Sequence, residues 1–183
     1  MASATQTAAG TTTWKIDPTH THVEFAVKHM MITTVKGRFS GVTGEIRLDE
    51  PTFSASKVDI DIEVATIDTR EPQRDTHLRS GDFFDVEKYP KISFRSTSID
   101  GTLESFKLSG DLTIHGVTRP ATLDVTYEGR GKDPWGGERI GFAATAKIKR
   151  SDFGLTWNAA LETGGFLVGD DVKISLDVEA VKG

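Results

Sequence analysis

Apolar residues occur at every second position over most of this 183-residue chain. The clearest run lies in residues 57–64, where charged residues separate Val58, Ile60, Ile62 and Val64. Similar alternation occurs in further segments, at residues 23–28, 45–48, 92–94, 106–114, 123–127, 142–148 and 172–179. A period of two is that of a β-strand with one buried and one solvated face. The pattern therefore predicts about eight strands.

The connections between these segments predict an antiparallel order. Asp100-Gly101 is a two-residue hairpin signal, because both central positions of a type I′ turn need positive φ. Several late strands run to about a dozen residues, or roughly 40 Å each at about 3.3 Å per residue. About eight such strands can close into a barrel that holds side chains or one small ligand. We therefore expect an all-β fold, an extended eight-stranded antiparallel barrel with one or two short helices.

Two segments interrupt the strand pattern. Residues 68–80 contain too few apolar residues for a core strand, and Thr69 or Asp68 could cap a helix there with Pro72 in its first turn. This segment is predicted to form a short helix or lid over one end of the barrel. Residues 29–34 are predicted to form a short helical turn that directs Met30 and Met31 inward.

The rest of the composition defines one domain and a tail. Residues 1–13 are rich in Ala, Thr, Ser and Gln and lack the basic start and apolar run of a secretory signal, so a disordered tail is predicted there. Residues 14–183 are expected to form one domain whose core needs no disulfide. No stretch approaches the roughly 18 consecutive apolar residues of a spanning helix, so stable membrane insertion is not expected. The expectation is a soluble, cytoplasmic protein.

Charge and cysteine content exclude several function classes. Acidic residues outnumber basic ones, 27 to 22, and the chain lacks the basic footprint that nucleic acid needs. The absence of cysteine excludes thiol catalysis. No Walker A loop, nucleophile elbow, zinc-protease motif or complete dinucleotide fingerprint occurs. Neither a catalytic residue nor a cofactor is therefore predicted.

The histidines support one alternative, a metal-dependent enzyme. His20 and His22 are two residues apart and would share a face of a strand. A zinc site could be completed by His29, His77 or His115. Against a metal, no third ligand follows at a fixed spacing, and ordinary polar or loop histidines explain the same residues. We therefore predict no metal site.

A cluster of charged residues lies within the predicted helix. Charge-assisted hydrogen bonds to a phosphate or another polar head group could come from Arg74, Asp75, His77 and Arg79, together with Arg38. The same residues could equally form a surface salt-bridge network or a helix cap. The residues alone leave both interpretations open.

The aromatic residues of the middle and late chain leave the barrel interior undecided. Inward alternation is the same in a barrel filled with side chains and in one with a cavity. The residues concerned are Phe83, Phe84, Tyr89, Phe94, Phe153, Trp157 and Phe166. A filled barrel that serves as a stress-related partner-binding module is therefore a further alternative to a ligand-binding barrel.

Several motifs of the chain form a distinctive set. The most specific are RDTHL at residues 74–78, DFFDV at 82–86 and GDLTIHGVT at 110–118. Further segments of the set are residues 14–21, 23–29 and 35–39 near the beginning, and 150–158 and 168–172 near the end. Together these segments resemble the YceI-like family, also described as polyisoprenoid-binding proteins. The resemblance covers nearly the whole chain after the tail.

The resemblance implies an extended lipocalin-like barrel, commonly a homodimer, that carries or stores a lipid without catalysis. A polyisoprenoid chain, an isoprenoid quinone tail or a fatty-acid derivative would occupy a hydrophobic tunnel. Apolar side chains are predicted to line the tunnel at Phe25, Val27, Phe39, Phe94, Leu112, Phe153 and Trp157. Polar side chains are predicted to hold the head group at Arg38, Arg74, His77, His115 and Asn158.

Overall fold

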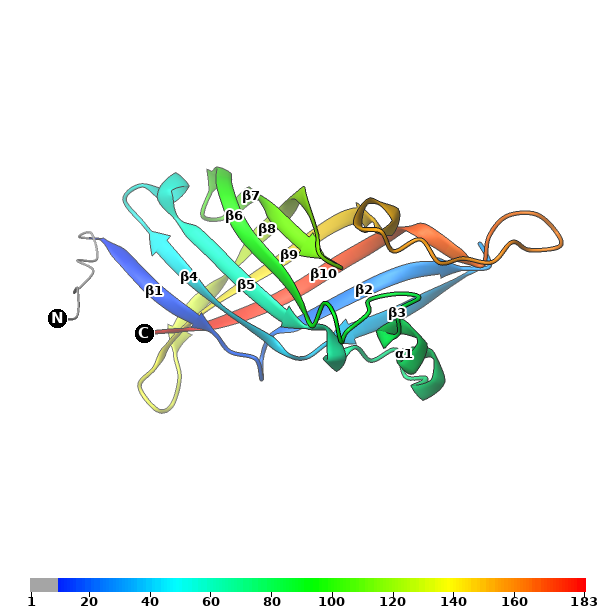
Figure 1. Cartoon of the computed structure of the whole chain (residues 1–183). Helices are drawn as coiled ribbons and strands as arrows, with labels where there is room; N and C mark the ends of the chain where they lie inside the picture. Colours follow the sequence, from blue (N-terminus) through cyan, green and yellow to red (C-terminus); the bar gives the residue numbers. More distant parts are fainter. Residues whose placement is uncertain (1–9) are drawn as a thin grey trace.

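The computed structural model, which describes residues 10–183, is an elongated barrel of antiparallel strands (Figure 1). Neighbouring strands follow the order β1-β4-β5-β6-β7-β8-β9-β10-β2-β3, and β1 also pairs with β10. The strands are β1 Thr11–Ile16, β2 His22–His29, β3 Thr33–Phe39, β4 Val42–Asp49, β5 Lys57–Glu63, β6 Lys91–Thr102, β7 Ser105–Ile114, β8 Val117–Lys132, β9 Glu138–Lys149 and β10 Val168–Lys182. The predicted all-β fold is confirmed.

Two strands of the barrel are each interrupted in the middle. β1 and β2 are successive halves of one long strand, and β3 and β4 are halves of the next. β1 pairs with β4 and β2 pairs with β3, so the two long strands stay paired along their length. β10 lies against both β1 and β2, with Trp14 opposite Lys182 and Val23 opposite Leu176. The ring of strands thereby closes, and the predicted eight-stranded antiparallel barrel is confirmed.

The late strands give the barrel its long axis. β6 and β9 contain 12 residues each, β8 contains 16 and β10 contains 15. At roughly 3.3 Å per residue, β10 extends about 50 Å. The predicted elongation is therefore confirmed.

The turn between β6 and β7 lies beyond the predicted position. Thr102 pairs with Ser105, so the turn lies between these residues and not at Asp100-Gly101. Gly101 has a positive φ of 127° within β6, where a Cβ would lie 2.6 Å from the backbone oxygen of Ser105. The glycine is needed for this close approach of two strands, which the sequence pattern alone could not separate from a turn.

Part of the predicted tail belongs to the barrel. Residues 1–9 lie outside the described residues. Residues 11–13 pair with residues 47–49 of β4 and form the beginning of β1. Three consecutive threonines, which are β-branched and suit a strand, thus extend the domain before residue 14.

One helix, α1 at Pro72–Arg79, lies at one end of the barrel (Figure 1). Glu71 caps α1 by accepting a hydrogen bond from the backbone N–H of Gln73. The predicted helix within residues 68–80 is therefore confirmed. Short 3-10 turns also occur, namely η1 Phe53–Ala55, η2 Val64–Thr66 and η3 Arg150–Phe153. No helix in residues 10–183 is long and apolar enough to cross a membrane.

The predicted helical turn in residues 29–34 is wrong. Residues 29–32 instead form the tight turn between β2 and β3, closed by a hydrogen bond of 3.1 Å from the Ile32 N–H to the His29 carbonyl. Met30 and Met31 have positive φ values of 51° and 64°, and their side chains are exposed. Strand pairing up to His29 and from Thr33 leaves a three-residue connection, which points the methionines away from the barrel.

β8 and β9 separate at one end of the barrel. Their pairing begins with Asp124 opposite Thr145, so residues 117–123 of β8 have no partner on β9. The turn η3 lies in this gap, where the Arg119 guanidinium donates to the Asp152 carbonyl at 3.2 Å. The barrel wall is therefore completed by η3 at this end.

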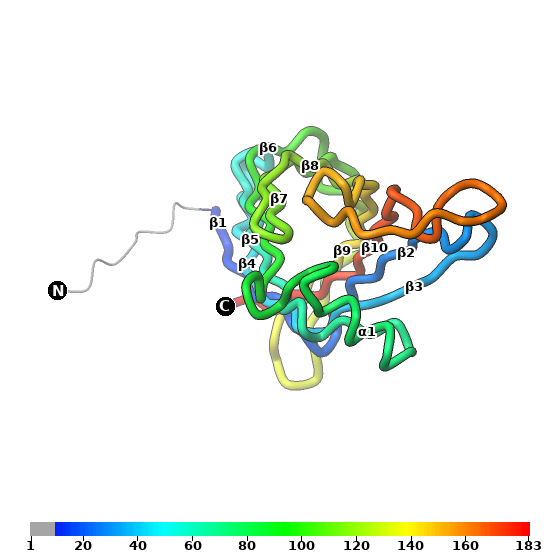
Figure 2. The backbone as a smooth tube through the Cα atoms, turned by 45° about the vertical axis from the view of Figure 1, so that its right-hand side comes forward, coloured from blue at the N-terminus to red at the C-terminus, as the bar shows by residue number. Residues whose placement is uncertain are grey.

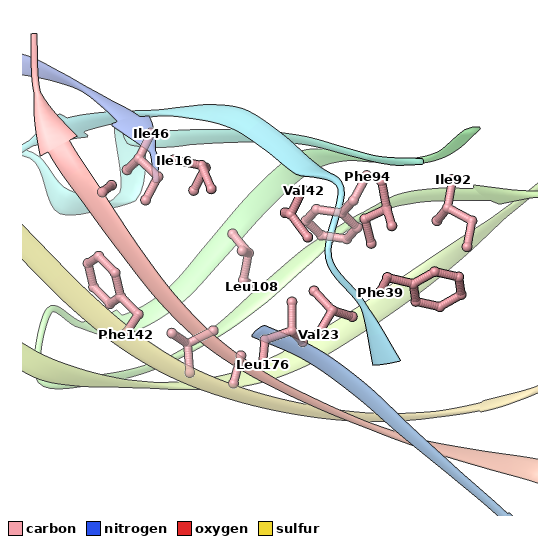
Figure 3. Packing of buried hydrophobic residues seen from close by; sticks show 14 of the residues in the cluster. Ile16, Val23, Phe39, Val42, Ile46, Ile92, Phe94, Leu108, Phe142 and Leu176 are labelled. Atoms are coloured by element: carbon pink, nitrogen blue, oxygen red, sulfur yellow. The ribbon is translucent and has the colours of Figure 1, made fainter. Parts of the chain in front are cut away.

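The inward faces of the strands supply the core (Figure 3). Alternate residues of several strands point into one interior, among them Phe39, Ile46, Phe94, Leu108, Phe142 and Leu176. Trp14 on β1 is only 1% exposed, although β1 is one of the shortest strands. Its position opposite Ile46 and Lys182 places it at the seam where the ring closes.

A cluster of ion pairs joins the break between β1 and β2 to the opposite end of the chain. Arg139 Nη1 lies 2.7 Å from both Asp17 and Glu179, and Arg139 Nε lies 2.9 Å from Asp133. Hydrogen bonds from His20 and Arg139 hold the pKa of Asp17 well below its usual range. The bonds to Asp17, Asp133 and Glu179 raise the pKa of Arg139. The cluster thus fixes the bend of the interrupted strand against β9 and β10.

Replacing Trp14 with Ala is expected to lower the free energy of unfolding by about 3–5 kcal/mol, because it leaves a cavity at the closing seam. Trp135 in the β8–β9 turn is 84% exposed and serves as the matched control. Trp135→Ala should change the free energy of unfolding by less than about 0.5 kcal/mol. Urea denaturation followed by circular dichroism measures both. Equal effects of the two substitutions would contradict this role of Trp14.

Asp17→Asn is expected to destabilise the protein at neutral pH and to reduce its sensitivity to acid. An aspartate whose folded-state pKa is depressed stabilises the fold above its unfolded pKa of about 3.9, and this contribution is lost as the pH falls toward the folded pKa. The difference in Tm between wild type and variant should therefore be full at neutral pH and shrink below about pH 4. Thermal unfolding at a series of pH values tests this, and a constant difference would refute it.

Candidate functional site

A cavity of about 380 Å³ lies inside the barrel. Its wall is formed by the inward faces of β2 to β10, and most of the lining side chains are apolar. The lining extends from Phe53 in η1 to His29 and Leu167 beside the β2–β3 turn, so the cavity follows the long axis of the barrel. Small-molecule sites typically measure about 300–1,000 Å³. The interior is therefore a ligand-sized apolar space.

Aromatic rings pack together at the end of the barrel where η1 lies. The ring centroids of Phe53 and Phe106 are 4.9 Å apart with the planes at 75°. Phe142 lies edge-on to Phe106 at 6.1 Å and beside Tyr127 at 5.8 Å. Edge-to-face contacts of this kind favour aromatic packing. This end of the cavity is apolar and lined by aromatic rings.

Polar side chains gather at the opposite end, which we call the mouth. α1, the segment after it and the connection between β9 and β10 all lie at the mouth (Figure 2). Arg74 of α1 lines the cavity and is also exposed to solvent, so the cavity reaches the surface here. The two ends of the cavity therefore differ in chemistry.

Six of the seven apolar residues predicted for the tunnel lie in the cavity wall, namely Phe25, Val27, Phe39, Phe94, Leu112 and Trp157. Phe25 lies across its strand partner Gly37, where a Cβ would come within 2.3 Å of the ring. The Phe25 and Phe39 rings are 5.5 Å apart. The absence of a side chain at Gly37 thus allows Phe25 its place in the wall.

Phe153 is not in the cavity wall, contrary to the sequence prediction. It is buried in η3, at the gap between β8 and β9, and lines a groove there with Arg119 and Lys149. The inward alternation of β9 ends at Lys149, where the chain leaves the sheet. The strand pattern therefore could not place Phe153.

Arg74 is one of the predicted polar residues that the structure brings to the cavity. Its Nε donates to the Thr69 hydroxyl at 2.8 Å, and its Nη2 donates to the Thr69 carbonyl at 2.7 Å. Thr69 is held in turn by the buried carboxylate of Asp75, which accepts from its backbone N–H and its hydroxyl. The second terminal nitrogen of Arg74, Nη1, makes no hydrogen bond within residues 10–183. Arg74 is thus held in place with donors left for a ligand.

His77 is the second predicted polar residue in the cavity wall. Its Nε2 lies 2.9 Å from a carboxylate oxygen of Asp82. Its ring is edge-on to Phe83 at 5.0 Å and to Trp157 at 4.8 Å, and all three rings line the cavity. An imidazole held by a carboxylate therefore lies among aromatic rings at the mouth.

Arg38, predicted to hold the head group, points away from the cavity. Its side chain is 61% exposed and lies 3.4 Å from Asp68. Because Arg38 precedes the inward Phe39 on β3, strand alternation directs it outward. The prediction was wrong because it rested on the charge that Arg38 shares with Arg74. It did not take into account which face of β3 carries Arg38.

His115 and Asn158 also lie outside the cavity wall, contrary to prediction. His115 occupies the β7–β8 turn with a φ of 55°, where its ring packs on Tyr89 and its Nδ1 lies 3.3 Å from the Phe153 carbonyl. The Asn158 side chain bonds to both the carbonyl and the N–H of Val168. Both residues satisfy backbone groups near the mouth, so their contribution is structural.

The sequence prediction missed Arg150, a buried residue of the cavity wall. Its guanidinium donates at 2.7 to 3.1 Å to four backbone carbonyls, those of Leu155, Trp157, Val168 and Gly169. Burial lowers the pKa of Arg150, whereas the charge of Asp170 acts in the opposite direction. Arg150 thus places a buried positive charge in the cavity wall, with its hydrogen bonds made to the backbone. Only the motif at residues 150–158 pointed to this segment.

Other wall residues were not singled out from the sequence, among them Ile99, Phe106, Leu108, Val125, Phe142 and Ala144. Most of them lie on strands whose inward face the alternation had already identified. Alternation therefore identified these residues as inward-facing. It does not separate residues of the cavity wall from residues of the packed core.

The histidine metal site considered from the sequence does not form. His29 lies in the cavity wall, whereas His20 and His22 are exposed. Within the part of the chain that the structure describes, one group of potential ligands converges, formed by Asp17, His20 and Glu179. Arg139 already bonds to both carboxylates of this group. The group is therefore an ion-pair cluster in which the guanidinium of Arg139 takes the place of a metal cation.

The sequence matches a family model, described as the YceI-like domain, over residues 14–180. A UPF0312 protein from Serratia proteamaculans is 39% identical over 171 residues, which cover 92% of this chain and 86% of that protein. Family and relative thus agree over almost the whole described chain.

Solved structures show the same fold. The YCEI protein of Campylobacter jejuni is 36% identical, with a TM-score of 0.70 over 85% of this chain and 90% of that one. A polyisoprenoid binding domain from Saccharophagus degradans is 15% identical, with a TM-score of 0.66 over 93% of this chain and 98% of that one. The second likeness concerns the fold alone. On the family match and these relatives, the chain belongs to the YceI-like family.

Proposed function

We propose that this protein binds a long-chain amphiphilic lipid in the barrel cavity and carries or stores it without catalysis. The observation that supports the proposal is a long apolar cavity with the basic side chains Arg74, His77 and Arg150 in its wall at the mouth. Burial of an apolar tail is favourable by roughly 25 cal/mol per Å². A polar head group needs hydrogen-bonding partners, which the mouth offers. A polyisoprenoid, an isoprenoid quinone or a fatty-acid derivative has this combination of parts.

The comparison with the Saccharophagus degradans domain supports a lipid as the ligand of this barrel, because that protein is named for polyisoprenoid binding. A barrel filled with side chains, the alternative function considered from the sequence, is disfavoured by the cavity. The homodimer implied by the resemblance stays a prediction.

The head group is expected to contribute more to selectivity than the tail. An apolar wall gains from any tail that fits, so tail chemistry is weakly distinguished. Two guanidinium groups and an imidazole favour an anionic or strongly hydrogen-bonding head. We therefore propose a preference for phosphate-terminated or carboxylate-terminated amphiphiles.

Organic extraction of protein purified from its own host, followed by mass spectrometry, tests the carrier function. We expect a long-chain lipid near one equivalent per barrel. Protein that is empty and that also takes up no long-chain lipid in vitro would refute the proposal.

Ala144→Phe is expected to reduce lipid uptake by at least about tenfold, because the new ring occupies the cavity beside Val125 and Leu176. Overpacking would cost about 1–3 kcal/mol of stability, which circular dichroism can follow. Ala143→Phe is the matched control, since Ala143 is adjacent on β9 but outside the cavity wall. Uptake of a fluorescent long-chain fatty acid measures both variants, and unchanged uptake by folded Ala144→Phe would argue against the cavity as the site.

Arg74→Gln is expected to weaken binding of a phosphate-terminated or carboxylate-terminated amphiphile by about tenfold, because a charge-assisted hydrogen bond is lost. Binding of an alcohol with the same tail should change little. Arg38→Gln, on the outer face of β3, should affect neither ligand. Titration calorimetry compares the three proteins, and an equal loss for acid and alcohol would show that Arg74 does not recognise the head group.

A further inference from the structure

Exposed apolar side chains are concentrated at the mouth. In residues 10–183 the exposed large hydrophobic side chains are Met30, Met31, Ile32, Trp135 and Phe166. Four of these belong to the β2–β3 turn and the β9–β10 connection, and we call Met30, Met31, Ile32 and Phe166 the tip. Three of the tip side chains are 60% to 75% exposed. Trp135 lies in the β8–β9 turn at the opposite end of the barrel (Figure 1).

The two segments of the tip contact one another. The Met30 N–H donates to the Leu167 carbonyl at 2.8 Å. The Met31 sulfur lies so close to Gly165 that a Cβ there would be 2.3 Å from it. In Figure 1 the β2–β3 turn and the β9–β10 connection extend together beyond the barrel. The tip is therefore one apolar surface and not a set of scattered side chains.

The β2–β3 turn retains backbone strain in order to present two methionines. A four-residue β-turn with positive φ at both central positions favours Asn-Gly or a similar pair at these positions. Met30 and Met31 occupy these positions at φ values of 51° and 64°. Strain of this kind tends to occur at functional sites. Exposure and strain at the same two residues thus point to a role outside folding.

The tip is continuous with the cavity. His29 precedes Met30, Leu167 follows Phe166, and both residues line the cavity. The tip therefore adjoins the end of the cavity at which Arg74 and His77 lie.

Several lysines lie on the strands that lead to the tip, although the chain has a net charge of −5. Lys36, Lys173 and Lys147 lie in one row across β3, β10 and β9, since Ala26 pairs with both Lys36 and Lys173, and Lys173 pairs with Lys147. Lys28 lies two residues before Met30, about 7 Å along the strand.

Asp170 and Asp171 are engaged by other groups, whereas Glu24 and Glu162 form no ion pair in residues 10–183. Asp171 pairs with Lys147, and Asp170 bonds to Ser151. Glu24 lies opposite Arg38, and Glu162 is in the β9–β10 connection. Lys28, Lys36, Lys149 and Lys173 form no ion pair in residues 10–183 and are exposed. An anionic surface in contact with the tip would meet these lysines.

We propose that the tip docks on an anionic lipid bilayer, with its apolar side chains in the interface and the lysines near the head groups. Apolar insertion combined with basic residues is the usual basis of peripheral membrane binding. Docking presents the mouth to the bilayer, where a lipid can move between membrane and cavity. Only this transfer step rests on the proposed function, since none of the four tip residues lines the cavity.

Sedimentation with vesicles tests the docking. Wild-type protein should bind phosphatidylcholine vesicles that contain phosphatidylglycerol, bind pure phosphatidylcholine more weakly, and lose binding as salt increases. The triple variant Met30→Asn/Met31→Gly/Phe166→Ser should bind at least about tenfold more weakly. Asn-Gly suits the turn, so the variant should fold at least as well as wild type. Trp135→Ser, at the opposite end, should bind as wild type does.

The alternative occupant of the tip is a second copy of the chain. Analytical ultracentrifugation should give the same oligomeric state for wild type and triple variant; dissociation of a wild-type oligomer by the triple substitution would overturn the proposal. Equal vesicle binding by wild type and triple variant would also overturn it. Ala144→Phe should bind vesicles as wild type does, although it takes up little lipid. A wild-type protein that docks but takes up no lipid would refute the carrier function and leave the docking standing.

Discussion

Closure of the ring of strands is the constraint on which the rest of the structure depends. Pairing of β1 with β10 closes the sheet into a ring, and only β3, which pairs with β2 alone among the described strands, keeps an edge without a strand partner. Closure requires the first long strand to bend between Ile16 and His22. The buried hydroxyl of Thr21 accepts from the N–H of Glu179 and donates to its carbonyl, replacing strand pairing at the bend. The Arg139 ion pairs hold the same bend from the surface.

The bend also makes the two ends of the barrel different. β1 and β4 complete the ring of strands beside η1, where aromatic side chains line the interior. β2 and β3 continue beyond the ring as a hairpin at the other end, together with α1 and the β9–β10 connection (Figures 1 and 2). Arg74 and Arg150 thus reach the cavity from segments where the regular strands end. A tail directed toward η1 and a head group at the mouth follow from this arrangement.

The sequence predicts what depends on strand periodicity and misses what depends on irregular backbone. Alternation identified the inward faces that carry Phe25, Phe94 and Phe142, and the short helix followed from the few apolar residues of residues 68–80. The helix is capped by Glu71 and not by the predicted Asp68 or Thr69. Alternation cannot show whether inward side chains meet across the barrel, so the cavity itself came from the resemblance and then from the structure. Arg150 and Phe153 lie in η3, where neither the strand period nor the helix period applies.

The hollow interior is itself an argument for a ligand. Side chains around an empty apolar space lose the dispersion contacts that a packed core would supply, so a cavity destabilises the fold that contains it. Larger residues could fill the space, yet the wall carries Ala121, Ala144 and Ala146 on inward positions. Long hydrogen-bonded strands and the closed ring can offset this loss without help from the interior. A molecule that fills the cavity restores the missing contacts and binds only the folded state, so occupancy should stabilise the barrel in proportion to affinity. Binding of the lipid thus supplies the packing contacts that the hollow core lacks.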